Sequence, residues 1–115
     1  MKRFSCLLAI LLVVGPASAQ KIEFNRDIRP ILSDKCFACH GPDAKETRSE
    51  YRLDTFDHAT SAIDGVIGIV PGKLKDSELH WRIHSDDSSE VMPPPESKPS
   101  PPPAEIALLD RWIEQ

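Results

Sequence analysis

The residues best suited to chemistry are two cysteines and a histidine in one short run. Cys36-Phe37-Ala38-Cys39-His40 has the C-x-x-C-H spacing by which c-type haem is attached. Two thiols at this spacing on a helical turn are each able to add across one haem vinyl group, which makes two thioether bonds. The imidazole of His40 then lies against the haem face as the proximal iron ligand. The run therefore predicts one covalently bound haem c, held by Cys36 and Cys39 and ligated by His40.

Other chemistries of the same run stay open as alternatives. A thioredoxin-like cysteine pair usually follows a strand and opens a helix, whereas this pair ends an apolar helical stripe. A structural zinc site needs four ligands in a tetrahedron, and the adjacent Cys39 and His40 are poorly placed to share one metal. A disulfide across two residues would stabilise the chain little. A haem-free thiol or zinc protein is the remaining alternative to a haem protein.

The second axial position of the iron has four candidate ligands, which are Met92, His58, His80 and His84. Met92 is the only methionine after the first residue, and Pro93 to Pro95 restrict the backbone behind it. A stiff loop keeps a weak iron–sulfur bond closed at small entropic cost. We therefore expect Met92 as the distal ligand, a pairing that raises the reduction potential relative to two histidines. We expect the three histidines to be exposed surface residues.

A different role for Met92 leads to a different function. Methionines often fill apolar gaps in a core, and Met92 would then leave the iron open. An open iron site supports haem sensing or peroxidase-like chemistry. With both axial positions filled, by contrast, no substrate binds and the protein is an electron carrier rather than an enzyme.

The first 19 residues have the pattern of a secretory signal. Two basic residues precede the apolar run Phe4–Val14, and the small residues Ala17–Ala19 stand before Gln20. The apolar run is shorter than the roughly 20 residues that cross a bilayer, so no transmembrane span is expected in the mature chain. The sequence predicts a protein exported to the periplasm or an equivalent compartment. An uncleaved anchor or a short buried helix is the alternative.

Residues 20–115 form the expected single domain, and they are acidic. Two of the 14 basic residues lie in the leader, which leaves 12 against 18 acidic residues and a net charge of −6. A nucleic-acid or anionic-membrane binder would need a basic face, so neither partner is expected. We expect redox partner proteins with a basic docking patch. The low apolar content of so small a domain suggests that a cofactor completes its core.

Hydrophobic periodicity predicts three helices. The first runs from Asn25 or Asp27 to Lys35, with Pro30 tolerated in its first turn. Its apolar stripe ends at Cys36, so the face that seeks the core also directs this cysteine inward. A second helix is expected from Asp76 or Ser77 to about His84, and a final helix from near Pro103. Short strands are expected at residues 51–56 and 65–70, a loop at 41–48, and an ordered proline-rich strap at 92–103.

The chain resembles the planctomycete-type cytochrome c domain. The resemblance rests on these segments: Phe24–Leu32, Cys36–Asp43, Arg52–Asp54, Val70–Lys73, Ser77–Leu79, Met92–Pro94 and Glu105–Ile113. It implies a small, mostly helical fold like that of mono-haem class I cytochromes. It further implies attachment through Cys36 and Cys39, a proximal His40 and a distal Met92. Members are commonly the leading module of a larger protein.

Together these observations predict an all-α, class I cytochrome c-like fold. Three or so helices with long loops surround one covalent haem, and the first and last helices pack against each other beside it. Six apolar residues are expected to line the haem cavity, namely Phe37, Leu53, Ile69, Val70, Leu79 and Leu109. Arg52 is a candidate partner for a haem propionate, because a guanidinium fork suits a carboxylate, and an unmatched surface arginine is the alternative.

Overall fold

The computed structural model describes residues 14–15, 20–43 and 49–115. The leader predicted for residues 1–19 lies outside the described residues, apart from Val14 and Gly15, and so does most of the loop expected at 41–48. Within the described ranges, no helix combines the length and the apolar character that crossing a bilayer requires.

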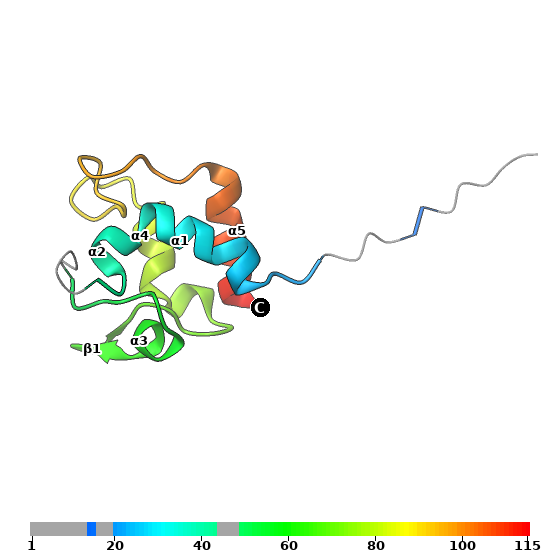
Figure 1. The fold of residues 1–115 in the computed structure, drawn as a ribbon, viewed down its shortest axis with the longest axis horizontal. Coiled ribbons are helices and arrows are strands. Elements are labelled where there is room, and N and C mark those ends of the chain that lie inside the picture. Colours follow the sequence, from blue (N-terminus) through cyan, green and yellow to red (C-terminus); the bar gives the residue numbers. More distant parts are fainter. Residues whose placement is uncertain (1–13, 16–19, 44–48) are drawn as a thin grey trace, which may run out of the picture.

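The described chain is mainly helical, with one small two-stranded sheet (Figure 1). In chain order the elements are the π-helical turn η1 (Phe24–Ile28), α1 (Arg29–Lys35), α2 (Phe37–His40), α3 (Phe56–Thr60), β1 (Ala62–Ile63), β2 (Val66–Ile67), the 3-10 turn η2 (Leu74–Asp76), α4 (Glu78–His84) and α5 (Pro103–Glu114).

The first predicted helix is confirmed, with a wider opening turn than expected. Arg29 N–H bonds to the carbonyl of Phe24, which closes the π-helical turn and leads directly into α1. Pro30 falls in the first turn of α1, where its missing N–H leaves no bond unmade. Ile28, Ile31 and Leu32 of the stripe are buried as predicted, while Cys36 at its end is only half-buried. The backbone then departs from helical geometry at Cys36, and α2 continues the chain.

The predicted strands are mostly wrong, and the all-α expectation misses a small hairpin. Residues 51–55 form no strand, and Phe56 begins α3. Of residues 65–70, only Val66–Ile67 form a strand, which pairs with Ala62–Ile63. Asp64 and Gly65 between them both have positive φ, 50° and 82°. An Asp-Gly pair is a strong signal for a tight hairpin turn, because both central residues of that turn need positive φ.

The two C-terminal helices are placed as the periodicity predicts. Leu79 and Ile83 of α4 and Leu109 and Ile113 of α5 are all buried. Ser77 precedes α4, but its hydroxyl does not cap that helix. It accepts from Val70 N–H at 2.9 Å and donates to the Lys73 carbonyl at 2.9 Å. Ser77 therefore fixes the turn before α4 rather than the helix end.

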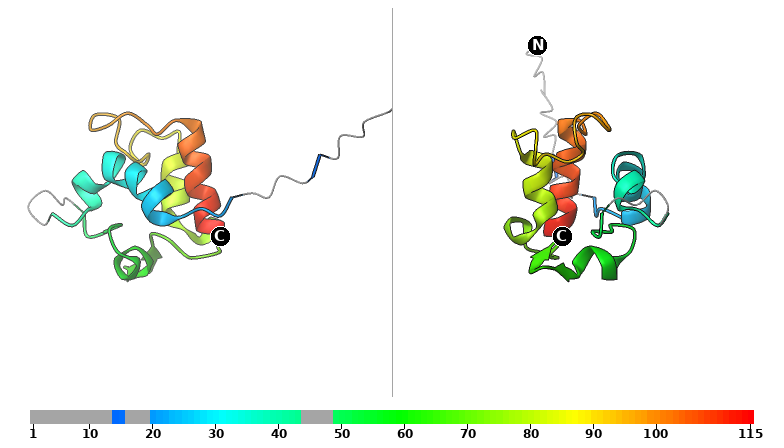
Figure 2. Two further views of the ribbon diagram at one scale, coloured as in Figure 1. Left: turned by 45° about the vertical axis from the view of Figure 1, so that its right-hand side comes forward. Right: turned by 90° about the vertical axis from the view of Figure 1, so that its left-hand side faces the viewer.

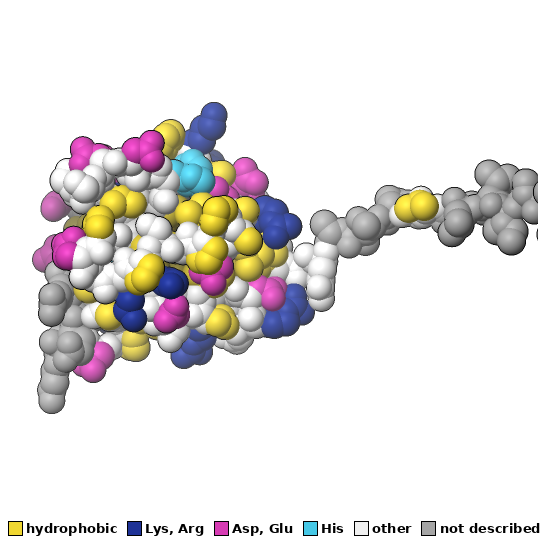
Figure 3. Space-filling view, turned by 90° about the horizontal axis from the view of Figure 1, so that it is seen from above, with side chains coloured by type: hydrophobic (Ala, Val, Ile, Leu, Met, Phe, Trp, Pro, Cys, Tyr) yellow, Lys and Arg dark blue, Asp and Glu magenta, His cyan; other side chains and the backbone are white. Residues whose placement is uncertain are grey.

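The first and last helical segments pack together, as predicted. The ring of Phe24 in η1 lies 5.6 Å from that of Trp112 in α5. The side-chain amide of Gln115 makes two 2.9 Å hydrogen bonds with the backbone N–H and carbonyl of Ile22. In the right-hand view of Figure 2, α1 and α2 lie to one side, and α4 and α5 lie next to each other on the other side. Seen from above, apolar side chains gather in the middle of the face, with acidic and basic ones around them (Figure 3).

Candidate functional site

The two cysteines lie on one turn of the chain. Backbone N–H groups of Cys39 and His40 both donate to the Cys36 carbonyl, at 3.2 and 2.9 Å. Both thiols are free and half-buried. Burial raises the pKa of Cys36 to about 11, and the nearby charges of Asp34 and Cys39 add to the shift. Thiol redox pairs depend on a lowered thiol pKa, so the environment of Cys36 does not favour that chemistry.

The ring of His40 is held by a backbone group from a different segment. Its Nδ1 lies 2.6 Å from the carbonyl oxygen of Tyr51. A carbonyl oxygen only accepts, so Nδ1 carries the hydrogen and the Nε2 of the neutral ring keeps its lone pair. Metal-ligating histidines almost always donate their other ring N–H in this way. The contact therefore prepares Nε2 of His40 to bind a metal.

The segment that supplies this carbonyl is itself fixed at two points. Leu53 N–H donates to the His40 carbonyl at 2.8 Å. The Tyr51 hydroxyl donates to the Ile63 carbonyl at 3.0 Å, which ties the segment to the β1–β2 hairpin. The hairpin that the sequence prediction missed thus helps to orient His40. The Asp64-Gly65 pair, which favours a tight turn with positive φ, was the sequence signal that would have predicted the hairpin.

Gly41 lies against the turn that carries the cysteines. A Cβ at this position would lie 2.7 Å from the Cβ of Phe37 and 2.9 Å from its Cα. Real side-chain contacts are not this short, so any larger residue would displace the backbone of α2. The absence of a side chain at Gly41 lets the chain leave α2 directly after His40.

Met92 lies on a separate segment that is anchored to α4. Its N–H donates to the Arg82 carbonyl at 3.0 Å, close to the end of that helix. Met92 is half-buried, and the peptide bond to Pro93 is cis. The structure thus brings Cys36, Cys39 and His40 together on one turn and places Met92 on a second segment.

The three other histidines have polar partners of their own. His80 Nδ1 lies 3.0 Å and His84 Nε2 lies 2.7 Å from the two oxygens of Asp110. His58 Nδ1 lies 2.8 Å from the Thr55 hydroxyl. The expectation of exposed histidines holds for His58 and His84, but it is wrong for His80, whose side chain is only 17% exposed because it packs toward α5.

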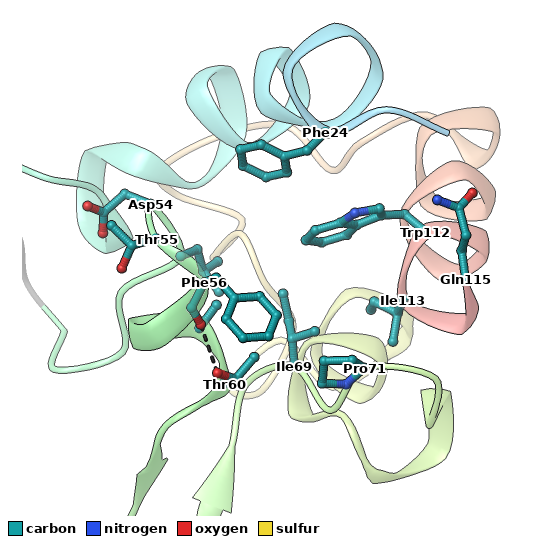
Figure 4. Close-up of a pocket in the computed structure, with 12 residues that line it drawn as sticks. Phe24, Asp54, Thr55, Phe56, Thr60, Ile69, Pro71, Trp112, Ile113 and Gln115 are labelled. Atoms are coloured by element: carbon teal, nitrogen blue, oxygen red, sulfur yellow. Dashed lines mark hydrogen bonds between the residues drawn. The ribbon is translucent and has the colours of Figure 1, made fainter. Parts of the chain in front are cut away.

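A cavity of about 400 Å³ lies between η1, α3 and α5. Figure 4 shows Phe24 and Trp112 facing Phe56 and Ile69 across it. Of the six residues expected to line a haem cavity, Leu53 and Ile69 line this one. Leu79 and Leu109 are buried in the core, while Phe37 and Val70 are half-buried.

The guanidinium of Arg52 is already paired. Its Nε and one terminal nitrogen contact the two carboxylate oxygens of Asp54, at 3.0 and 2.7 Å. Arg52 is therefore not an unpartnered surface arginine, and its pairing with a haem propionate stays a prediction.

The donor set fits the needs of haem c. Two free thiols lie on one turn, and the imidazole beside them has Nε2 available. A family model described as Planctomycete cytochrome C matches residues 36–96, more than half of the chain, and spans Cys36, Cys39, His40 and Met92. Neither the comparison with curated proteins nor that with solved structures gives a match.

Proposed function

Because the chain belongs to the planctomycete cytochrome c family, we propose that it carries one haem c and transfers single electrons between exported redox partners. The observation that carries the proposal is the C-x-x-C-H turn whose histidine donates Nδ1–H to the Tyr51 carbonyl at 2.6 Å. This arrangement unites two attachment points and one oriented metal ligand. In this proposal the fold is that of a class I cytochrome c.

Each residue of the turn has its own role in this proposal. Cys36 and Cys39 form the two thioether bonds, which keep the cofactor from dissociating. His40 supplies Nε2 as the proximal iron ligand, and Tyr51 fixes its ring. When bound, haem c supplies a one-electron couple between ferric and ferrous iron.

Met92 is the distal ligand in this proposal. Its hydrogen bond to Arg82 and the three following prolines limit the freedom of its backbone, which lowers the entropic cost of ligation. The competing ligands His80 and His84 already contact Asp110. A thioether ligand stabilises the ferrous state, so the potential is higher than with two histidines.

A filled distal position also makes the protein a carrier rather than an enzyme. Met92 and His40 would then both ligate the iron, which would leave no open position for a substrate. The acidic mature chain favours a partner with a basic docking patch, and the rate of electron transfer falls as salt rises. The secretory pattern of residues 1–19 supports export to the periplasm or an equivalent compartment.

The test is spectroscopic and uses the chain expressed with a c-type cytochrome maturation system. A pyridine haemochrome assay and the protein mass should show one covalent haem. The oxidised protein should show the far-red charge-transfer band of a methionine–iron bond. Bare polypeptide would overturn the whole proposal. High-spin ferric bands with rapid cyanide binding would overturn the carrier function and favour a sensor or a peroxidase-like site.

A further inference from the structure

Two histidines of α4 and one carboxylate of α5 converge outside the C-x-x-C-H turn. His80 Nδ1 lies 3.0 Å from Oδ1 of Asp110, and His84 Nε2 lies 2.7 Å from Oδ2. The three ligand atoms all lie within 4.8 Å of one another. Residues 80 and 110 are far apart in sequence, so the contact between the two helices creates the cluster.

The spacing of the two histidines suits metal binding. His80 and His84 are four residues apart, which places both rings on one face of α4, with centroids 4.6 Å apart. Two histidines at this spacing on a helix form the metal-binding face of several zinc enzymes. Ligand atoms around tetrahedral zinc, each about 2.0–2.2 Å from the metal, lie roughly 3.3 Å apart. Small side-chain rotations would bring the three atoms to that separation.

Burial and charge also favour a divalent cation. The side chains of Asp110 and His80 are 18% and 17% exposed, whereas His84 is 43% exposed. Two ligands are therefore positioned by packing, and the third leaves an entry path from solvent. The ring of Trp81 lies against His80 at 5.2 Å and limits its movement on that side. The carboxylate of Asp110, placed between the two rings, supplies the negative charge that attracts a cation.

We propose that His80, His84 and Asp110 bind one divalent transition-metal ion of the zinc class, with water completing the coordination. Imidazole and carboxylate together are typical ligands of Zn²⁺. The bound ion joins α4 to α5. Because Met92 N–H bonds to the Arg82 carbonyl in α4, the ion also steadies the helix that anchors Met92.

This site shares no residue with the proposed haem site. Cys36, Cys39, His40 and Met92 take no part in it, so zinc binding and haem attachment succeed or fail separately. His58 offers a matched control, because it is also an exposed histidine close to an aspartate, with its Nδ1 3.9 Å from Asp54 Oδ1.

The experiment is a calorimetric titration of the haem-loaded protein with ZnCl₂ in a buffer that does not chelate metals. Zinc retained after dialysis is counted against haem by elemental analysis. We expect one zinc per chain. His84→Ala and the isosteric Asp110→Asn should each weaken zinc binding by at least about tenfold, since even the loss of a supporting residue costs 10–100-fold. His58→Ala should bind as the parent does.

Thermal unfolding gives a second measurement. Zinc should raise the unfolding temperature of the parent and of His58→Ala, and it should not raise that of Asp110→Asn, because only a ligand held by the folded state stabilises it. An unchanged haem spectrum shows that each variant is folded. No retained zinc in the parent, or equal zinc affinity in the parent and in both site variants, overturns the proposal.

Discussion

The Nδ1 atom of His40 lies 2.6 Å from the backbone carbonyl oxygen of Tyr51, eleven residues further along the chain. The acceptor is a main-chain group, so the orientation of the ring depends on the path of residues 51–53 rather than on a particular side chain. That path is fixed by the bonds from Leu53 to His40 and from Tyr51 to Ile63.

Met92→Ala should lower the reduction potential of the haem-loaded protein. The loss of the thioether removes the ligand that stabilises ferrous iron, and the expected fall is on the order of 0.1–0.2 V, a fraction of the roughly 0.8 V that axial ligands span. Spectroelectrochemistry measures the reduction potential. A titration with imidazole should show that this added ligand binds to the iron once Met92 is removed. Val91→Ala is the neighbouring control. An unchanged potential in Met92→Ala would mean that another residue is the distal ligand.

Gly41→Ala should destabilise the protein by about 1–3 kcal/mol, the usual cost of overpacking. The added methyl group would meet the backbone of Phe37, which has no room to move without shifting α2. Gly68→Ala is the milder comparison, because its Cβ would approach the Ala59 carbonyl to 3.2 Å, which requires a much smaller shift and should cost less stability. Guanidinium unfolding measures both. An equal loss of unfolding free energy in the two variants would contradict the crowding at Gly41.

Ser77→Ala should lower the free energy of unfolding by about 1–3 kcal/mol. Ser77 is fully buried, and its hydroxyl is the partner of the Val70 N–H, which would be left unpaired. The exposed Ser33→Ala should change stability by less than about 0.5 kcal/mol. Urea unfolding distinguishes the two, and a Ser77 variant as stable as the parent would show that water replaces the hydroxyl.

Asp27→Asn should remove part of the acid dependence of stability. The Arg26 side chain, helped by the Glu23 N–H, holds the pKa of the Asp27 carboxyl at about 2. This pKa lies below the unfolded value of about 3.9. The contribution of Asp27 to the free energy of unfolding is therefore complete above about pH 3.9 and is lost as the pH falls toward 2. The stability difference between parent and variant should therefore shrink between about pH 4 and pH 2. Urea unfolding across this range tests it, and a constant difference would refute it.

The sequence predicted the helices more accurately than the strands, for a physical reason. Ile28, Ile31 and Leu32, and later Leu109 and Ile113, repeat at helical spacing, and the structure buries all of them. The hairpin strands have two residues each and are too short to show an alternating pattern. The Asp64-Gly65 turn was the available signal for the hairpin.

Within the candidate site, short-range arrangement was predictable and long-range contacts were not. The spacing of Cys36, Cys39 and His40 is by itself enough to place them on one turn. No pattern in the sequence connects His40 with the Tyr51 carbonyl, because every residue type has a backbone carbonyl that could accept this hydrogen bond. The pairing of His80 and His84 with Asp110 likewise depends on how two helices meet.

The paired hydrogen bonds between Gln115 and Ile22 bring the first core residue next to the residue that follows α5. Closely spaced points of entry and exit are what allows a domain to be inserted into a loop of a host protein or to be circularly permuted. A circularly permuted form of the folded part, with Gln115 joined to Ile22 through a short linker, should therefore fold as the parent does.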